Sequence, residues 1–308
     1  MDDQLELVIL TRNRPDYFKK SLDSILVQSH KKKNFNILIS DNSSNNETFK
    51  IYSSYRKYDN LSYIKRNNLS SHNHFSQVID NLTGQYSILL HDDDIMKENF
   101  ISEVFKYLPK KEFVATAFNA ELIDMNDHKL GIKMHNLDRD MFFFSPKEFL
   151  KQYLPGNKGI CPFPSYVYNT KILKRAYREV HDIAGKHSDV IILSRLLKYG
   201  NIMWKRDTVM FYRVHKGSDS YKENIVDRIK LIKEMKVQGI NKNYFPLELF
   251  RIYSWLRWLK QNKYLSLNMK SWRGKIVLCS ILQHVLRFLF KRNFWFLILS
   301  RCLKALKK

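Results

Sequence analysis

The stretch Gly84-Gln85-Tyr86-Ser87-Ile88-Leu89-Leu90-His91-Asp92-Asp93-Asp94 contains an apolar run that is followed by three aspartates. The apolar run predicts a buried strand, which carries the carboxylates to its end. Adjacent carboxylates repel one another unless water or a cation neutralises them, and Mg²⁺ and Mn²⁺ prefer oxygen ligands. A solvated loop or a helix start after Asp94 is the alternative interpretation, but the buried strand favours a cation site.

The same alternation of strand, polar cluster and helix recurs on both sides of this stretch. It predicts an α/β fold with a mostly parallel sheet and helices on both faces, and ligands bind such sheets beyond the carboxyl ends of the strands. The polar clusters Thr11–Arg14, Ser40–Ser44 and His91–Asp94 all fall at such ends. Strands are expected at Leu5–Leu10, Phe35–Ile39, Leu61–Ile64, Tyr86–Leu90 and Phe113–Phe118, and helices at Pro15–Leu26, Glu47–Tyr58, His74–Leu82 and Glu98–Tyr107.

The second half of the chain has a weaker pattern. Residues Ala120–Met134 are compatible with a hairpin. Ser188 is expected to be the N-cap of a helix over Asp189–Tyr199, which Gly200 ends. Two further short strands are expected, at Ile202–Trp204 and Val209–Val214.

The composition narrows the class of protein. The chain has 308 residues, a formal charge of +23 and three cysteines without a C-x-x-C pair. A disulfide scaffold and a thiolate zinc site are therefore not expected, and neither are a signal peptide or a membrane span. The chain contains neither a P-loop nor a G-x-G-x-x-G motif, which argues against a P-loop NTPase and an NAD enzyme. A cytoplasmic location is expected.

The positive charge is concentrated at the end of the chain. Residues 241–308 hold 15 Lys and Arg and one acid, Glu248. We therefore expect one domain over residues 1–240 and a basic, aromatic-rich helical region over 241–308. Bulky apolar side chains such as Leu247, Phe250 and Trp255, interleaved with bases, are typical of helices that lie on an anionic membrane surface. Packing on the domain, a homodimer interface and a nucleic-acid arm are the alternatives.

Four segments, taken in order, resemble the family 2 glycosyltransferases of GT-A fold, and the likeness covers about residues 4–220. They are Leu7–Pro15 with Ile39–Ser44, Gly84–Asp94, His187–Asp189, and Tyr212-Arg213-Val214-His215 with Ser218 and Ser220. His91 stands where many members have the first metal-binding aspartate, and Ser188 replaces the usual acid before the catalytic base. The resemblance implies an inverting enzyme of the bacterial surface-polysaccharide type, which moves a sugar from a nucleoside-diphosphate sugar, with UDP favoured, to a glycan or lipid-linked acceptor.

The resemblance also implies residue roles. Asp189 would be the general base, or would merely complement a helix dipole. Asp41 would contact the base or ribose, or would form an Asx turn. Mn²⁺ or Mg²⁺ would be held by Asp93 with Asp92 or Asp94, and His215 would add a ligand or a diphosphate contact. The implied ligands of the metal are Asp93, Asp94 and His215, and the implied substrate contacts are Thr11, Asn13, Arg14, Asp41, Asn68, Asn73 and Asp92.

Two other functions remain open at this point. A nucleic-acid-binding protein would explain the charge, although the bases avoid the clusters at the strand ends. A protein that binds nucleotide sugars without transferring them is compatible with the departures at His91 and Ser188.

Overall fold

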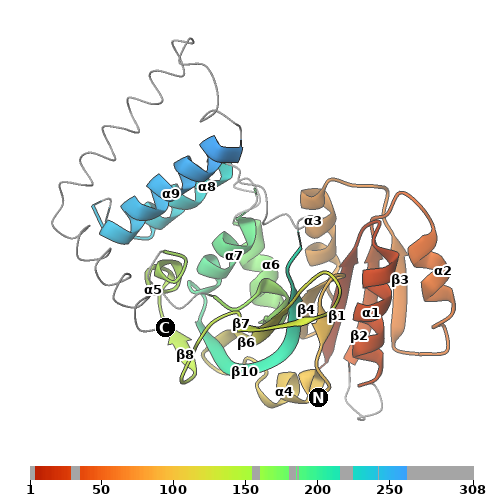
Figure 1. Cartoon of the computed structure of the whole chain (residues 1–308). Helices are drawn as coiled ribbons and strands as arrows, with labels where there is room; N and C mark the ends of the chain where they lie inside the picture. Colours follow the sequence, from red (N-terminus) through yellow and green to blue (C-terminus); the bar gives the residue numbers. More distant parts are fainter. Residues whose placement is uncertain are drawn as a thin grey trace, which may run out of the picture.

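The computed structural model describes residues 4–28, 35–154, 160–179, 185, 187–215, 225–241 and 243–261. The expectations for Ser218, Ser220 and most of the basic region, residues 262–308, lie outside the described residues. Within them, a single mixed sheet forms the centre of the molecule and helices cover both of its faces (Figure 1).

The first half of the sheet is wholly parallel. Its strands lie in the order β3 (Leu61–Lys65), β2 (Phe35–Asp41), β1 (Leu5–Thr11) and β4 (Tyr86–His91). The register pairs Thr11 with Asp41 and Leu10 with His91, so the strands end level with one another. Along the chain, β2 and β3 are added on one side of β1, and β4 then pairs with the other side of β1. Ligands of such sheets bind where the strand order reverses, which is here at the carboxyl ends of β1 and β4.

The second half of the sheet is mixed. The strand β9 (Val167–Asn169) runs antiparallel between β4 and β6 (Phe113–Ile123), and β10 (Asn201–Arg213) runs parallel to β6. The short strands β5 (Ile95–Met96) and β8 (Met141–Phe143) pair with β10. The strand β7 (Lys129–Lys133) pairs with β6, as the predicted hairpin requires.

Two apolar clusters lie on opposite faces of the sheet because alternate strand residues point to opposite sides. On one face, β1 and β2 pack against helices α1 (Pro15–Leu26), α2 (Glu47–Ser53) and α4 (Phe100–Lys106). On the other face, the core includes side chains of α3 (Ser71–Asn81), α5 (Pro146–Lys151), α6 (Thr170–Arg178) and α7 (Ser188–Leu196). The short 3₁₀ helix Phe163–Ser165 lies beside β4 and β6.

Three expectations are wrong in detail. The two strands expected at 202–204 and 209–214 form one strand, β10, whose register shifts near Lys205 and Thr208. Ser188 is the first residue of α7, and His187 occupies the N-cap position without a side-chain cap. The helix α2 ends at Ser53 and not at Tyr58. The sequence pattern also did not predict β9 or α6.

Two helices follow the sheet. Leu231 and Met235 of α8 (Ile225–Val237) and Leu247 and Phe250 of α9 (Phe245–Gln261) belong to the same buried cluster as α7. The expectation that Leu247 and Phe250 are membrane anchors is therefore wrong, because both side chains are buried in the protein core. In the part of the chain that the structure describes, no helix is long and apolar enough to cross a membrane. The predicted boundary at residues 240–241 falls between α8 and α9, which pack on one another.

Candidate active site

The aspartate loop lies between the ends of β4 and β10. Arg213, the last residue of β10, donates its backbone N–H to Asp94 Oδ1 at 3.0 Å. Its guanidinium Nε donates to the carbonyl of Asp93 at 2.7 Å, and Nη1 donates to the carbonyl of Asp124 at 2.9 Å. The Arg213 side chain is fully buried. It therefore holds the aspartate loop against the turn of the β6–β7 hairpin, a role that the sequence reasoning did not assign to it.

Asp93 is held by the guanidinium of Arg14 and the imidazole of His215. Arg14 Nη1 lies 2.7 Å from Asp93 Oδ2, and His215 Nε2 lies 2.9 Å from the same oxygen. Burial raises the pKa of Asp93, but His91, His215 and Arg14 together outweigh it and leave the pKa below its ordinary value. Asp93 is therefore an ionised carboxylate at neutral pH.

Asp94 is 1% exposed, and only one of its two carboxylate oxygens has a hydrogen-bond partner among the described residues. Oδ1 accepts the N–H of Arg213, whereas Oδ2 is buried and has no hydrogen-bond partner among the described residues. Burial, followed by the charge of Asp93, raises the pKa of Asp94 well above its ordinary value. Since a buried carboxylate oxygen without a partner is costly, the structure leaves this oxygen available to a cation.

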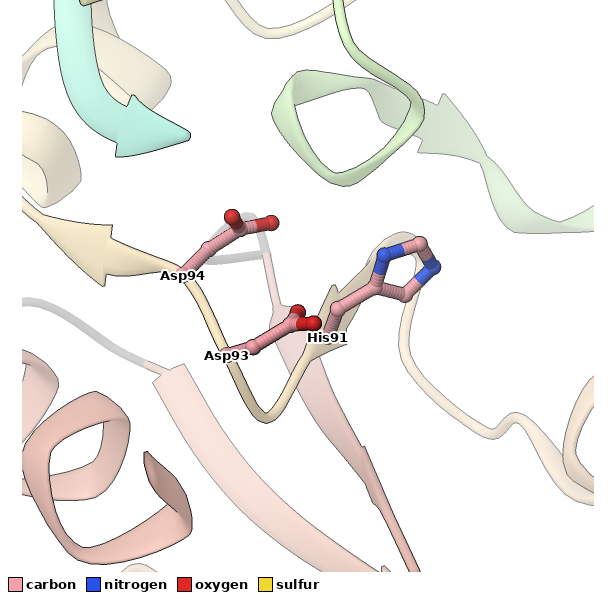
Figure 2. Close-up of side chains that lie close together, drawn as sticks. All are labelled: His91, Asp93 and Asp94. Atoms are coloured by element: carbon pink, nitrogen blue, oxygen red, sulfur yellow. The ribbon is translucent and has the colours of Figure 1, made fainter. Parts of the chain in front are cut away.

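The donor set fits a hard divalent ion. The ligand atoms of His91, Asp93 and Asp94 all lie within 4.8 Å of one another, and Figure 2 shows these side chains gathered around the turn that follows β4. Two carboxylates and one imidazole suit Mn²⁺ or Mg²⁺. His91 belongs to this group, although sequence reasoning treated it only as a departure. His215 touches the group through Asp93.

Asp92 points toward β1. Its carboxylate accepts the backbone N–H of Arg12 at 3.2 Å and contacts Arg14 Nη1 at 3.3 Å. Burial raises the pKa of Asp92 to about 6, although the positive charge of Arg14 opposes the shift. Arg14 thus bridges Asp92 and Asp93, and it links the loop after β1 to the aspartate loop.

The loops after β1 and β2 are bonded to each other. Asn13 has a left-handed backbone (φ 54°), and its Oδ1 accepts the N–H of Ser44 at 3.0 Å. Its own N–H donates to Ser43 Oγ at 2.8 Å. Thr11 is buried at the end of β1 beside Asp41. These contacts bring the predicted residues Thr11, Asn13 and Asp41 to the same edge of the sheet as the aspartate loop.

Asn68 and Asn73 lie further from the carboxylates. Asn68 Oδ1 accepts Arg12 Nη2 at 2.8 Å, which connects Asn68 to the loop after β1. Asn73 is in the first turn of α3, where its backbone N–H donates to the capping hydroxyl of Ser70. The contact of Asn73 is therefore that of a helix cap.

Asp189 is the second residue of α7 and is half-buried. Burial raises the pKa of Asp189 to about 6. Burial is also the main cause of the raised pKa of Tyr212, and the charges of Asp94, Asp93 and Asp189 add to it. Tyr212 therefore lies within electrostatic range of both the aspartate loop and Asp189.

Comparison with known proteins identifies the class. The model of glycosyl transferase family 2 matches residues 6–176, more than half of the chain, and the protein belongs to this family. An uncharacterized glycosyltransferase of Rickettsia felis is 26% identical over 113 residues, which are 37% of this chain and 18% of that protein. Glycosyltransferase GlyA of Streptococcus pneumoniae is 23% identical over 107 residues, 34% of this chain and 15% of that protein. The matches thus span less than a fifth of each of these relatives.

Solved structures show the same fold. Residues 1–349 of TarS from S. aureus, in complex with UDP-GlcNAc, align with a TM-score of 0.63 at 14% identity, over 92% of this chain and 82% of that chain. The mannosyltransferase PcManGT from Pyrobaculum calidifontis, in complex with GDP-Man and Mn²⁺, aligns with a TM-score of 0.55 at 11% identity, over 96% and 82%. The predicted GT-A fold, a mostly parallel sheet flanked by helices, is confirmed.

Proposed function

We propose that the protein is an inverting, metal-dependent glycosyltransferase that uses a nucleoside-diphosphate sugar, with UDP-sugars favoured. The observation that carries the proposal is the pair of carboxylates Asp93 and Asp94: the pKa of Asp93 is lowered, and the buried Asp94 has an oxygen without a hydrogen-bond partner among the described residues. Such a pair suits a cation that faces an anionic ligand. The bound nucleotides of TarS and PcManGT, UDP-GlcNAc and GDP-Man, are of the same chemical class.

The reaction first requires that the negative charge on the departing diphosphate be balanced. His91, Asp93 and Asp94 are the residues that would hold a divalent cation, which would supply positive charge beside the departing diphosphate. Arg14, with its guanidinium 2.7 Å from Asp93, is placed to exchange this contact for a phosphate oxygen. A guanidinium suits phosphate because it offers several N–H donors in one plane.

The nucleophile sets the second requirement. In a single displacement the acceptor hydroxyl oxygen bonds to the anomeric carbon while the bond from that carbon to the diphosphate oxygen breaks. The proton of the hydroxyl passes to Asp189, and the configuration at the anomeric carbon inverts. A carboxyl with a pKa of about 6 is a stronger base than an ordinary aspartate and is still ionised at neutral pH.

Replacing Asp189 by Asn tests this assignment. The change keeps the volume and removes the basic oxygen, so we expect donor binding within about twofold of wild type and transfer reduced about 10²–10⁴-fold. Binding is measured by calorimetry with Mn²⁺, and transfer by release of the nucleoside diphosphate. Asp59→Asn, at an exposed loop position, is the matched control. An equal loss of binding and transfer would assign Asp189 to the donor pocket, and a fully active Asp189→Asn would refute the proposed base.

The acceptor and the location form a second part of the proposal. We propose a glycan or lipid-linked acceptor in surface-polysaccharide synthesis and a peripheral position on the inner face of the membrane, supported by the 15 bases and single acid of residues 241–308. A chain ending at Gln261 keeps Leu247 and Phe250 in the core. Full-length protein should float with anionic vesicles, and this shortened chain should float less. Equal flotation would refute the role of the last residues.

A further inference from the structure

One face of α8 combines exposed apolar and basic side chains that the reaction scheme does not use. Val226, Ile229 and Val237 are 58%, 38% and 73% exposed, and Lys233 and Lys236 are exposed beside them. The spacing of these five positions places them on one side of the helix, here called the α8 outer face. Exposed apolar side chains that gather in this way mark a contact with a membrane or with another protein.

The two acids of α8 do not balance the charge of this face, because both are engaged elsewhere. Glu234 is 4% exposed, and its carboxylate accepts Arg195 Nη2 of α7 at 2.7 Å and Gln238 Nε2 at 2.7 Å. The Asp227 side chain is 13% exposed and lies 3.7 Å from Lys230 Nζ. The α8 outer face therefore presents lysines without an exposed acid, and its charge is positive.

The other side of α8 packs on the segment that carries the proposed base. A side chain at Gly185 would collide with the carboxylate of Asp227, so α8 lies directly against this residue. The carbonyl of Gly185 accepts the backbone N–H of Ser188 at 3.0 Å, and Asp189 follows. Near its other end, α7 is joined to α8 by the ion pair of Arg195. The helix that carries Asp189 is thus attached to α8 near both of its ends, and the two helices lie side by side (Figure 1).

We propose that the α8 outer face lies on the anionic surface of a membrane, an inference that rests on the membrane location in the proposed function. The three apolar side chains enter the region between headgroups and acyl chains, and the lysines meet anionic headgroups. Anionic lipid complements the charge of this face, whereas the lysines of two such faces would repel one another across a dimer interface. In this orientation α7 stands behind the membrane-bound helix, and the hydroxyl of a lipid-linked acceptor meets Asp189 close to the membrane surface.

Flotation of the full chain with vesicles tests the inference without any measurement of turnover. The probe is phosphatidylcholine vesicles that contain about one third phosphatidylglycerol, and the partition coefficient is measured across a lipid titration. The double variant Ile229→Glu with Val237→Glu should lower the partition coefficient at least about tenfold, because two apolar contacts become charges that the headgroups repel. The double variant Lys233→Gln with Lys236→Gln should lower it about tenfold in these vesicles and less than about twofold in pure phosphatidylcholine.

Val27→Glu is the matched control. Val27 is 57% exposed and follows α1, whose core residues belong to the cluster on the opposite face of the sheet from that of α8. The change should therefore alter the partition coefficient less than about twofold. Circular dichroism and urea unfolding show that each variant is folded before its partitioning is compared.

The outcomes separate the inference from the proposed function. Wild-type partitioning in both double variants overturns the inference, as does an equal loss in Val27→Glu. Wild-type partitioning together with conversion of a dimer into a monomer in light scattering would assign the α8 outer face to a second copy of the chain and would also overturn it. Wild type that does not bind anionic vesicles refutes the proposed membrane location, and the inference with it.

Discussion

Asp41 at the end of β2 and Asp94 after β4 are both buried aspartates at the same edge of the sheet, yet their surroundings differ. Asp41 receives donors from Ser43, Tyr63 and Lys65, and its pKa is lowered. Asp94 receives one backbone N–H, keeps one oxygen without a partner among the described residues, and has a raised pKa. The protein itself provides the donors for the first carboxylate, whereas under the proposed function a divalent cation would complete the second.

Between Asp41 and Asp94, the larger expected effect concerns Asp94. In Asp94→Asn the buried charge is lost, and we expect turnover to fall about 10²–10³-fold because the charge on the leaving diphosphate is no longer balanced. Release of the nucleoside diphosphate is measured across a Mn²⁺ titration, with Asp59→Asn as the control. Wild-type activity that persists in excess EDTA would contradict the metal site.

Asp189 offers a third carboxylate for the comparison. It is half-buried and has a raised pKa, and no other acid lies beside it in the sequence. Because the base must be ionised, kcat should rise about tenfold per pH unit up to about pH 6 and stay level above it. The profile is measured at saturating donor and Mn²⁺ between pH 4.5 and 8.5, a range chosen to span about two units on each side. A flat profile would exclude Asp189 as the group that takes the proton.

Asp41→Asn tests the stability side of the comparison. The change leaves the hydroxyl of Tyr63 and the ammonium of Lys65 with a poorer acceptor, so the free energy of unfolding should fall by about 1–3 kcal/mol. The figure is modest because Lys65 is 36% exposed and water can replace part of its contact. Asp94→Asn should leave the metal-free protein at least as stable as wild type at pH 7. Urea unfolding monitors both variants.

Asp41 and Asp94 also differ in the sign of their effect on how folding stability depends on pH. The lowered pKa of Asp41 contributes stability above the ordinary aspartate value of about 3.9, and this stability is lost as the pH falls through its folded-state pKa. The raised pKa of Asp94 acts in the opposite sense. Its contribution to folding stability is fully present below pH about 3.9 and is lost as the pH rises through the folded-state pKa of Asp94. The stability gap between wild type and Asp41→Asn should therefore close in acid. A gap that widens there would contradict the assignment.

The sequence predicted the half of the fold in which local signals agree. The strands β1, β2 and β4 are buried apolar runs that end in polar clusters, so a mostly parallel sheet with the site at this edge could be inferred. The order β3-β2-β1-β4 was not predicted, and only the first residue of β3 is buried. The strand β9 has three residues, Val167–Asn169, and its antiparallel place between β4 and β6 depends on pairing with distant segments. No local pattern encodes such a pairing.

The site was predictable to a similar extent. The three aspartates were named because they follow a buried strand, and Asp189 was named because His187–Asp189 resembles the segment that supplies the catalytic base in family 2 glycosyltransferases. His91 joins the cation group only through the turn of the loop, and Tyr63 and Lys65 reach Asp41 only through the β2–β3 register. In α9 the sequence pattern predicted a function that the structure does not support. Leu247 and Phe250 lie in a segment with the composition of a membrane-surface helix, but both are buried in the same cluster as side chains of α7 and α8.

The smallest expected effect is that of Tyr63→Phe, which removes one of the donors to Asp41. The phenol lies 2.6 Å from Asp41 Oδ2, and its ring stays packed on Tyr52, so the variant isolates a single hydrogen bond. We expect the free energy of unfolding to fall by about 0.5–1.5 kcal/mol. In the double variant Tyr63→Phe with Asp41→Asn, the second change should cost less than it does alone, because the two residues share that bond. Strict additivity in urea unfolding would show that Tyr63 does not stabilise the carboxylate, and Asp41 would then depend on Lys65 and the N–H of Ser43 alone.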